Sequence, residues 1–276
     1  MKALLAAFVV VVLAGCGSTK VPPSFAYATP GPAAPSPSVA PAPSSAASSI
    51  AASQPAPSAP AASVVTESPA PSIDPANFVP TIDNGWLPFI PGTSWTYQGL
   101  KDGEKAIDVV TVTHATKVIA GVTCVVVHDE LKVAGQLAET TDDYYAQDRD
   151  GNVWYFGEAT QELEGGKVTS TEGSWETSVD GAVPGLFMPA NPEIGYSGLQ
   201  EFYAGHAEDR FVVLLTGQKV KVPAGSYSDV MITGEWTRLE PNVLTEKAYA
   251  KGIGEIREAD VAGGNEKQEL VRTTAG

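Results

Sequence analysis

The sequence predicts a mainly β protein, with an antiparallel meander over residues 76–276 that forms a curved sheet or open barrel. From Ala76 onward, runs of β-branched and aromatic residues alternate with glycine-containing turns. Successive runs are separated by only a few residues, and strands joined by short turns pair antiparallel, because parallel pairs need long crossovers. No long stretch shows helical periodicity. These observations favour one acidic β domain after a disordered tether.

Composition divides the chain before any motif is considered. Fourteen of the 22 prolines fall in residues 1–75, whereas all five tryptophans follow residue 85. Residues 1–75 carry two basic and two acidic side chains, so the whole net charge of −15 belongs to the remaining 201 residues. Nucleic acids and anionic lipid head groups bind clusters of Lys and Arg. An acidic domain therefore argues against both partners.

Residues 1–15 have the pattern of an export signal. Met1-Lys2 is a short positive start, and Ala3 to Ala14 is an apolar run too short to span a membrane. The run ends in Leu13-Ala14-Gly15-Cys16, which resembles the lipobox of bacterial lipoproteins. The resemblance implies a diacylated Cys16 as the first mature residue, anchored at the extracytoplasmic face of the cell membrane. An ordinary cleaved signal with an incidental cysteine is the alternative.

Residues 16–75 are rich in proline, alanine and serine, as in Pro35-Ser36-Pro37-Ser38. Few large apolar side chains offset the entropy of ordering this backbone, so we expect a disordered tether with polyproline II stretches. A spacer between membrane and domain is the favoured interpretation. A proline-rich recognition segment is the alternative, although no basic residue flanks any proline after Lys20.

Ten strands are expected in the domain, with hairpin turns at Asp102-Gly103 and Asp150-Gly151. We expect Pro184–Pro192 to be a loop that can hold a helical turn. The strands are Ser94–Leu100, Ala106–Ile119, Val122–Leu131, Gln136–Gln147, Val153–Gly157, Arg210–Thr216, Ser226–Arg238, Glu246–Ala250, Ile253–Ala259 and Lys267–Thr273.

Alternation within these strands assigns side chains to opposite faces of the sheet. Cys124, Val126 and His128 share one face, and Val125, Val127 and Asp129 share the other. Adjacent aromatic residues must divide in the same way, as at Tyr144-Tyr145, Trp154-Tyr155-Phe156 and Phe202-Tyr203. One member of each set belongs to the core. The other lines a ligand cleft, a partner site or the second face of a covered sheet.

The domain also shows an internal similarity at an offset of 104 residues. Lys117-Val118-Ile119-Ala120-Gly121 resembles Lys221-Val222-Pro223-Ala224-Gly225, and Tyr145-Ala146 recurs as Tyr249-Ala250. A duplication predicts two similar meanders fused into one continuous sheet or barrel. Coincidence among valine-rich strands and glycine turns is the alternative.

Three motifs carry a resemblance over most of the domain: Pro91–Tyr97, Val222–Tyr227 and Tyr249–Gly254. They resemble segments of uncharacterised exported bacterial lipoproteins, some of which are thought similar to the lipoprotein-carrier fold. That fold implies a curved antiparallel sheet with an apolar concave face.

Residues with reactive side chains offer no catalytic motif. Cys124 in a valine-rich strand is expected to be a small buried hydrophobe, with His128 roughly 13 Å away along the strand. His206-Ala207-Glu208-Asp209 could place an imidazole and a carboxylate on one face, although a solvated edge is the simpler interpretation. Asp148, Asp150 and Asn152 alternate as calcium ligands do, but their spacing favours a hairpin turn.

We therefore expect lipidation at Cys16 and no catalytic, cofactor-binding or metal-binding residue. The favoured function is a membrane-anchored, non-enzymatic lipoprotein that binds an apolar ligand or an envelope partner. A first alternative is an extracytoplasmic hydrolase that uses Glu201, Glu208 and Asp209. A second is an envelope scaffold.

Overall fold

The computed structural model describes residues 73–276, so Cys16, the signal and nearly all of the tether lie outside it. Within the described residues, no helix is long and apolar enough to cross a membrane. The elements are a 3-10 helix η1 (Pro75–Asn77) and sixteen strands: β1 (Phe78–Val79), β2 (Ser94–Lys101), β3 (Glu104–Ile119), β4 (Val122–Val133), β5 (Gln136–Asp148), β6 (Val153–Glu164), β7 (Lys167–Ser170), β8 (Trp175–Glu176), β9 (Val183–Met188), β10 (Ser197–Leu199), β11 (Glu201–Phe202), β12 (Asp209–Val222), β13 (Gly225–Thr237), β14 (Leu244–Ala250), β15 (Gly254–Ala262) and β16 (Lys267–Thr274).

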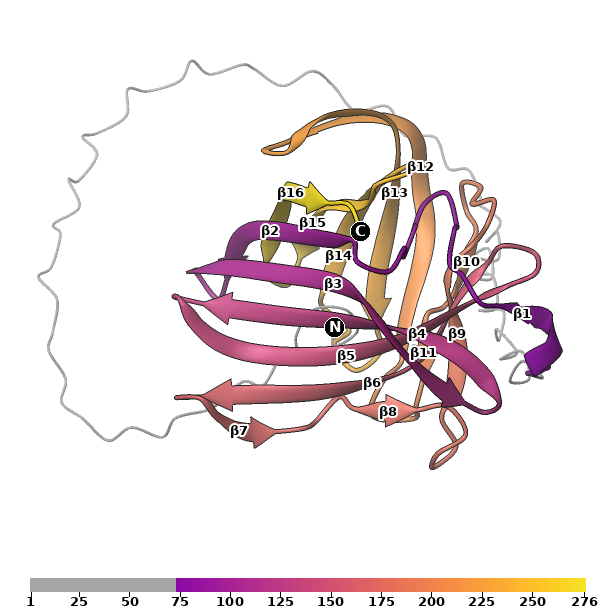
Figure 1. The fold of residues 1–276 in the computed structure, drawn as a ribbon. Coiled ribbons are helices and arrows are strands. Elements are labelled where there is room, and N and C mark those ends of the chain that lie inside the picture. Colours follow the sequence, from indigo (N-terminus) through magenta and orange to yellow (C-terminus); the bar gives the residue numbers. More distant parts are fainter. Residues whose placement is uncertain (1–72) are drawn as a thin grey trace, which may run out of the picture. The chain divides into compact units, whose positions relative to one another are not determined.

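The strands form one antiparallel sheet that curls into a nearly closed barrel. Its order is β10-β12-β13-β14-β15-β16-β2-β3-β4-β5-β6-β9-β11, and most neighbours in the barrel wall are also neighbours in sequence. In Figure 1 the long strands β3 to β6 cross the near side, and β12 to β14 run in a different direction behind them. The predicted antiparallel β class is confirmed.

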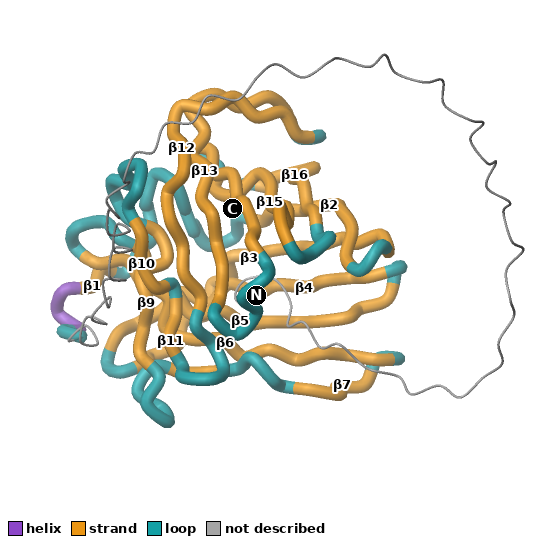
Figure 2. The backbone as a smooth tube through the Cα atoms, turned by 180° about the vertical axis from the view of Figure 1, so that it is seen from behind, coloured by secondary structure: helices purple, strands orange, loops and turns teal. Residues whose placement is uncertain are grey.

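A single short segment joins the two edges of the sheet. In residues 197–202, β10 pairs with β12 and β11 pairs with β9, with only Gln200 between them. Figure 2, which views the molecule from behind, shows β9, β10, β11 and β12 side by side. This kinked segment selects the barrel over the open curved sheet, since neither β9 nor β12 is left as a free edge.

The pairings divide the barrel into two similar halves. One half has the strand order β2-β3-β4-β5-β6-β9, and the other has the order β10-β12-β13-β14-β15-β16. Each strand of the first half corresponds to the strand at the same place in the second. The seams are β16 with β2 and β9 with β11. The two segments similar in sequence lie at equivalent hairpin turns, after Ile119 and after Val222. The topology therefore supports the predicted internal duplication.

All ten expected strands are present, several with longer ends. The prediction of a loop at Pro184–Pro192 was wrong for residues 184–188, because β9 pairs with β6 along Gly185 to Met188, and was correct for residues 189–192. Proline has no amide hydrogen for a strand ladder, and Pro184 pairs only with the two-residue β11. The expected Asp-Gly hairpin between β2 and β3 is confirmed, with positive φ at Asp102 (53°) and Gly103 (81°), as a type I′ turn requires.

Two hydrophobic clusters lie on opposite faces of the sheet. The main core fills the barrel and includes Tyr145 and Tyr155, and a smaller outer cluster includes Cys124, Tyr144 and Phe156. Adjacent aromatic residues of β5 and β6 thus divide between the faces as the alternation predicts.

Residues 82–91, here called the entry segment, connect β1 to β2 and insert into the main core. Trp86, Leu87 and Phe89 are all buried there. Asn84 fixes the turn before them, because its Oδ1 accepts hydrogen bonds from the amides of Trp86 (2.8 Å) and Leu87 (3.1 Å). Its Nδ2 donates to the carbonyl oxygen of Gly151 at 2.8 Å. The segment is thereby tied to the turn between β5 and β6.

Candidate functional site

A cavity of about 40 Å³ lies inside the barrel, beneath the entry segment. That volume accommodates roughly one to three water molecules or a small polar head group. Its wall combines aromatic and acidic side chains. The lining includes Leu87, Phe89, Trp95, Tyr97, Tyr145, Phe187 and Tyr249, together with Asp108, Asp129, Asp143, Glu255 and Gln268.

A groove of about 240 Å³ lies next to this cavity and shares Trp95 with it. Pro88 and Ile90 of the entry segment line the groove, opposite Ile253 and Thr273. Leu87 and Phe89 of the same segment line the cavity. The entry segment therefore separates an internal acidic cavity from an outer groove.

Strand alternation places three carboxyl groups on the inner face of the barrel. Asp129 is two residues from Val127, which belongs to the core, and Asp143 is two residues from Tyr145. Val127 lies directly opposite Asp143, and Val110 lies opposite Asp129. The carboxyl groups of β3, β4 and β5 consequently follow a diagonal across three neighbouring strands, within reach of one another.

Asp108 and Asp129 form a carboxyl pair joined by a side-chain hydrogen bond. Burial raises the pKa of Asp108, and burial together with the charge of Asp108 holds the pKa of Asp129 well above its usual range. A hydrogen bond between two carboxyl groups needs a proton on one of them, so the pair shares a proton. Oδ1 of Asp108 has no hydrogen-bond partner although its side chain is 1% exposed.

Asp143 is connected to a further acid, Glu158, through the hydroxyl of Tyr155. The hydroxyl of Tyr155 lies 2.5 Å from Oδ1 of Asp143 and 3.1 Å from Oε2 of Glu158. Burial raises the pKa of Asp143 to about 7 and holds that of Glu158 well above its usual range. One hydroxyl proton cannot serve both carboxylates, so these contacts favour a protonated Glu158 that donates to the tyrosine oxygen.

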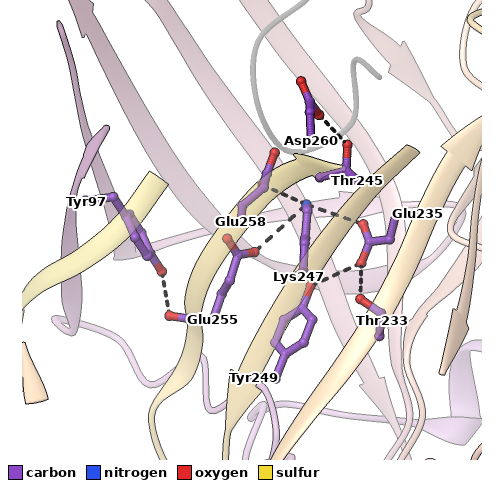
Figure 3. A network of polar contacts seen from close by, with 9 residues as sticks. All are labelled: Tyr97, Thr233, Glu235, Thr245, Lys247, Tyr249, Glu255, Glu258 and Asp260. Atoms are coloured by element: carbon purple, nitrogen blue, oxygen red, sulfur yellow. Dashed lines mark hydrogen bonds and ion pairs between the residues drawn. The ribbon is translucent and has the colours of Figure 1, made fainter. Parts of the chain in front are cut away.

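The other half of the barrel places a lysine among its acids (Figure 3). Nζ of Lys247 lies 3.3 Å from Glu258, 3.4 Å from Glu235 and 3.9 Å from Glu255, and the lysine side chain is 1% exposed. Burial alone lowers the pKa of Lys247, but the three carboxylates outweigh it and hold the pKa well above its usual range. This ammonium is the counter-ion of its half.

Strand register relates the two clusters position by position. Asp143 faces Val127 and Glu158, and Lys247 faces Thr233 and Glu258 in the same way. The equivalent pairs are Asp108 with Asp209, Asp129 with Glu235, Asp143 with Lys247, Tyr145 with Tyr249, Tyr155 with Glu255, and Glu158 with Glu258. Acidic character is retained at three positions, and the sign of the charge changes at Asp143 and Lys247.

Cys124 and His128 lie outside this site. Cys124 is fully buried in the outer cluster, and burial raises the pKa of its thiol to about 12, as expected of a small buried hydrophobe. His128 is half exposed on that outer face, with Nδ1 2.7 Å from Asp142.

Of the acids considered for hydrolysis, Glu201 and Asp209 are both buried and interact, since burial and then the charge of Asp209 raise the pKa of Glu201, whereas Glu208 lies apart from them. Glu208 accepts from the Gly205 amide and pairs with Arg238 at 2.9 Å near the surface. Asp209 points into the barrel instead, where burial raises its pKa to about 6, so the expected solvated edge was wrong at this residue. Glu201 is also buried and accepts from Nε1 of Trp175 at 2.8 Å. Because successive residues of an extended chain point to opposite faces, the side chain of Glu208 points away from that of Asp209.

The Asp148–Asn152 segment is the hairpin turn that its spacing favours. Oδ1 of Asp148 accepts from the amides of Asp150 (3.0 Å) and Asn152 (2.9 Å), and Oδ2 accepts from Nε1 of Trp154 (2.8 Å). These donors occupy the oxygens that a calcium site would use. In residues 73–276 no group of three or more His, Cys, Asp or Glu side chains is arranged to hold a metal ion.

The inner acidic cluster was missed by the sequence prediction, although a local signal exists. Asp129, Asp143 and Lys247 each lie two residues from a core side chain, and this parity places them inside. From the sequence alone, a charged residue in a strand is assigned to solvent, because the strand that supplies its buried partner is not known.

The comparisons with known proteins add little to this geometry. No protein family matches the sequence, and no curated protein matches it. One solved structure, of a candidate lipoprotein from Parabacteroides distasonis ATCC 8503, is similar at 9% identity over 68% of this chain and 97% of that chain, with a TM-score of 0.36.

Proposed function

We propose that this chain is a membrane-anchored extracytoplasmic lipoprotein whose barrel binds a small, largely apolar ligand. The observation that carries the binding proposal is the aromatic-walled cavity inside the barrel, together with the adjoining groove. Ligand sites are characteristically concave, mostly apolar and equipped with a few convergent polar groups. The cavity has all three properties.

The entry segment provides the route by which a ligand reaches the cavity. Its residues Leu87 and Phe89 occupy the space between the cavity and the groove, and they contact the core without belonging to the sheet ladder. Displacement of these two side chains would join about 40 Å³ to about 240 Å³. A drug-sized ligand needs a pocket of at least about 300 Å³, so the proposed ligand is small.

The test is identification of what co-purifies with the full chain. Native mass spectrometry followed by organic extraction should show a bound small molecule that dissociates on unfolding. A Val110→Phe variant, which fills the cavity from β3, should lose it. Val109→Phe on the outer face of the same strand should retain it. A protein that carries no small molecule would contradict ligand binding, and equal retention by both folded variants would contradict binding in this cavity.

The anchor is tested separately at Cys16. Two acyl chains give stable membrane attachment whereas one does not, so the wild-type chain should sediment with membranes of its native host. A Cys16→Ser variant should move to the soluble fraction and lack the mass of the diacylglyceryl group. Sedimentation of the variant with membranes at the wild-type level would refute the lipid anchor.

A further inference from the structure

The unequal charges of the two halves point to the chemical class of the ligand. In the second half, Lys247 supplies an ammonium to Glu235, Glu255 and Glu258. In the first half the equivalent position is Asp143. Among the described residues, no lysine or arginine forms an ion pair with Asp108, Asp129, Asp143 or Glu158.

The acids of the first half line the cavity, which they share with Glu255 of the second half. Asp108, Asp129 and Asp143 all line it, and each is less than a tenth exposed. Two buried polar atoms of its wall, Oδ1 of Asp108 and the hydroxyl of Tyr145, have no hydrogen-bond partner. Leaving a buried polar group without a hydrogen-bond partner destabilises the fold, so these atoms favour a donor in the cavity.

The aromatic wall suits the same kind of ligand. Trp95, Tyr97, Tyr145 and Tyr249 line the cavity together with the carboxyl groups, and Tyr97 is the direct cross-strand partner of Asp108. Aromatic ring faces attract cations, and the attraction is strongest where water is excluded. An ammonium group can contact the carboxyl groups while its apolar substituent packs against the aromatic rings. A divalent metal ion needs a shell of oxygen ligands, which the aromatic and aliphatic side chains of this lining do not supply.

We propose that Asp108, Asp129 and Asp143 bind the protonated primary amine of the ligand, which supplies the first half with a counter-ion as Lys247 does for the acids of the other half. This inference rests on the proposed binding function and specifies its head group. The three hydrogens of the ammonium meet three carboxyl groups from β3, β4 and β5. The apolar remainder extends past Trp95 toward the groove.

An isosteric pair of probes tests the head group. The full chain is titrated calorimetrically with 4-phenylbutylamine and with 4-phenylbutan-1-ol, which differ only in the ammonium and the hydroxyl. We expect the amine to bind at least tenfold more tightly. Asp143→Asn should reduce this preference to less than threefold while alcohol binding changes little.

Asp142→Asn is the matched control. This neighbour on β5 removes the same charge, but it lies on the outer face beside His128 and is half exposed. It should preserve the amine preference. Unfolding temperatures of both variants establish that they are folded, and Asp108→Asn repeats the test from β3 if Asp143→Asn does not fold.

The outcomes separate this inference from the proposed function. Equal affinity for the two probes in the wild-type chain overturns the ammonium site and leaves apolar binding intact. Binding of neither probe overturns both. Displacement of the amine by millimolar calcium or magnesium, or an equal loss of preference in Asp142→Asn, would also overturn the assignment to these three residues.

Discussion

Replacement of Lys247 by methionine should be among the most destabilising single substitutions in this domain. The variant keeps the length of the side chain but leaves Glu235, Glu255 and Glu258 buried without their shared counter-ion. At distances of 3.3–3.9 Å and an effective dielectric of about 20, each contact is worth roughly 4–5 kcal/mol before desolvation is subtracted. Removing one partner of a buried ion pair typically costs about 3–5 kcal/mol net, and we expect a loss in this range.

The assay is urea unfolding followed by tryptophan fluorescence, at pH 5 and at pH 8. Burial raises the pKa of Glu255 and Glu258 and the charge of Lys247 opposes this, so loss of the lysine raises their folded-state pKa further above the unfolded values. A raised carboxyl pKa stabilises below the unfolded value, and that stability is lost as pH rises. The destabilisation should therefore be larger at pH 8 than at pH 5.

Lys251→Met is the control, because Lys251 is mostly exposed and its partner Asp229 lies 3.8 Å away at the surface. Exposed ion pairs contribute about 0–1 kcal/mol, so this variant should unfold almost as the wild type does. The double variant Lys247→Met with Glu258→Gln should recover part of the loss. A Lys247→Met variant that loses less than about 1 kcal/mol, or equally at both pH values, would refute the counter-ion role.

Three further predictions concern other parts of the domain. The pKa of Asp143 rises from 3.8 to about 7 on folding, so its bound proton stabilises the folded state fully below about pH 4. That stability, about 4 kcal/mol by linkage, is lost as the pH rises to 7. The urea midpoint of Asp143→Asn should therefore depend less on pH than that of the wild type. Gly99→Ala should weaken the seam between β2 and β16 by about 1–3 kcal/mol or prevent folding, because an added Cβ would overlap the backbone carbonyl of Lys267; soluble yield and thermal unfolding measure this. Cys124, buried and with a pKa of about 12, should resist a thiol reagent until urea unfolds the domain; rapid labelling of the folded chain would contradict its assignment to the outer cluster.

The strand pattern was predictable because it is encoded locally. Alternation in Val122 to Asp129 correctly divides the core from the outer cluster, and Asp102-Gly103 specifies a hairpin turn through its backbone conformation. The strand at Pro184 was not predictable in this way. Its assignment depends on β6 and β11, and the residues of β11 that pair with β9 are seventeen and nineteen positions away from their partners.

The candidate site was predictable only in part. The parity of Asp129 and Asp143 assigns them to the face of Val127 and Tyr145, which the sequence alone can show. A buried carboxyl group needs a hydrogen-bond partner, and here the partners lie on other strands. Asp129 is paired with Asp108, and Asp143 is paired with Tyr155. Burying an unpartnered carboxylate is costly, so a sequence reading places it in solvent by default.

By itself the sequence determined the class of the fold, most strand positions and the similarity of the two halves; the division into signal, tether and acidic domain stays a prediction. Each of these depends on residues close together in the chain or on direct comparison of two segments. Only the tertiary structure decided that the barrel nearly closes, that its interior is acidic, and that Asp143 occupies the place of Lys247. Closure depends on a bridge between β9 and β12, and the charges depend on distances across strands. Both are properties of contacts that no local pattern specifies.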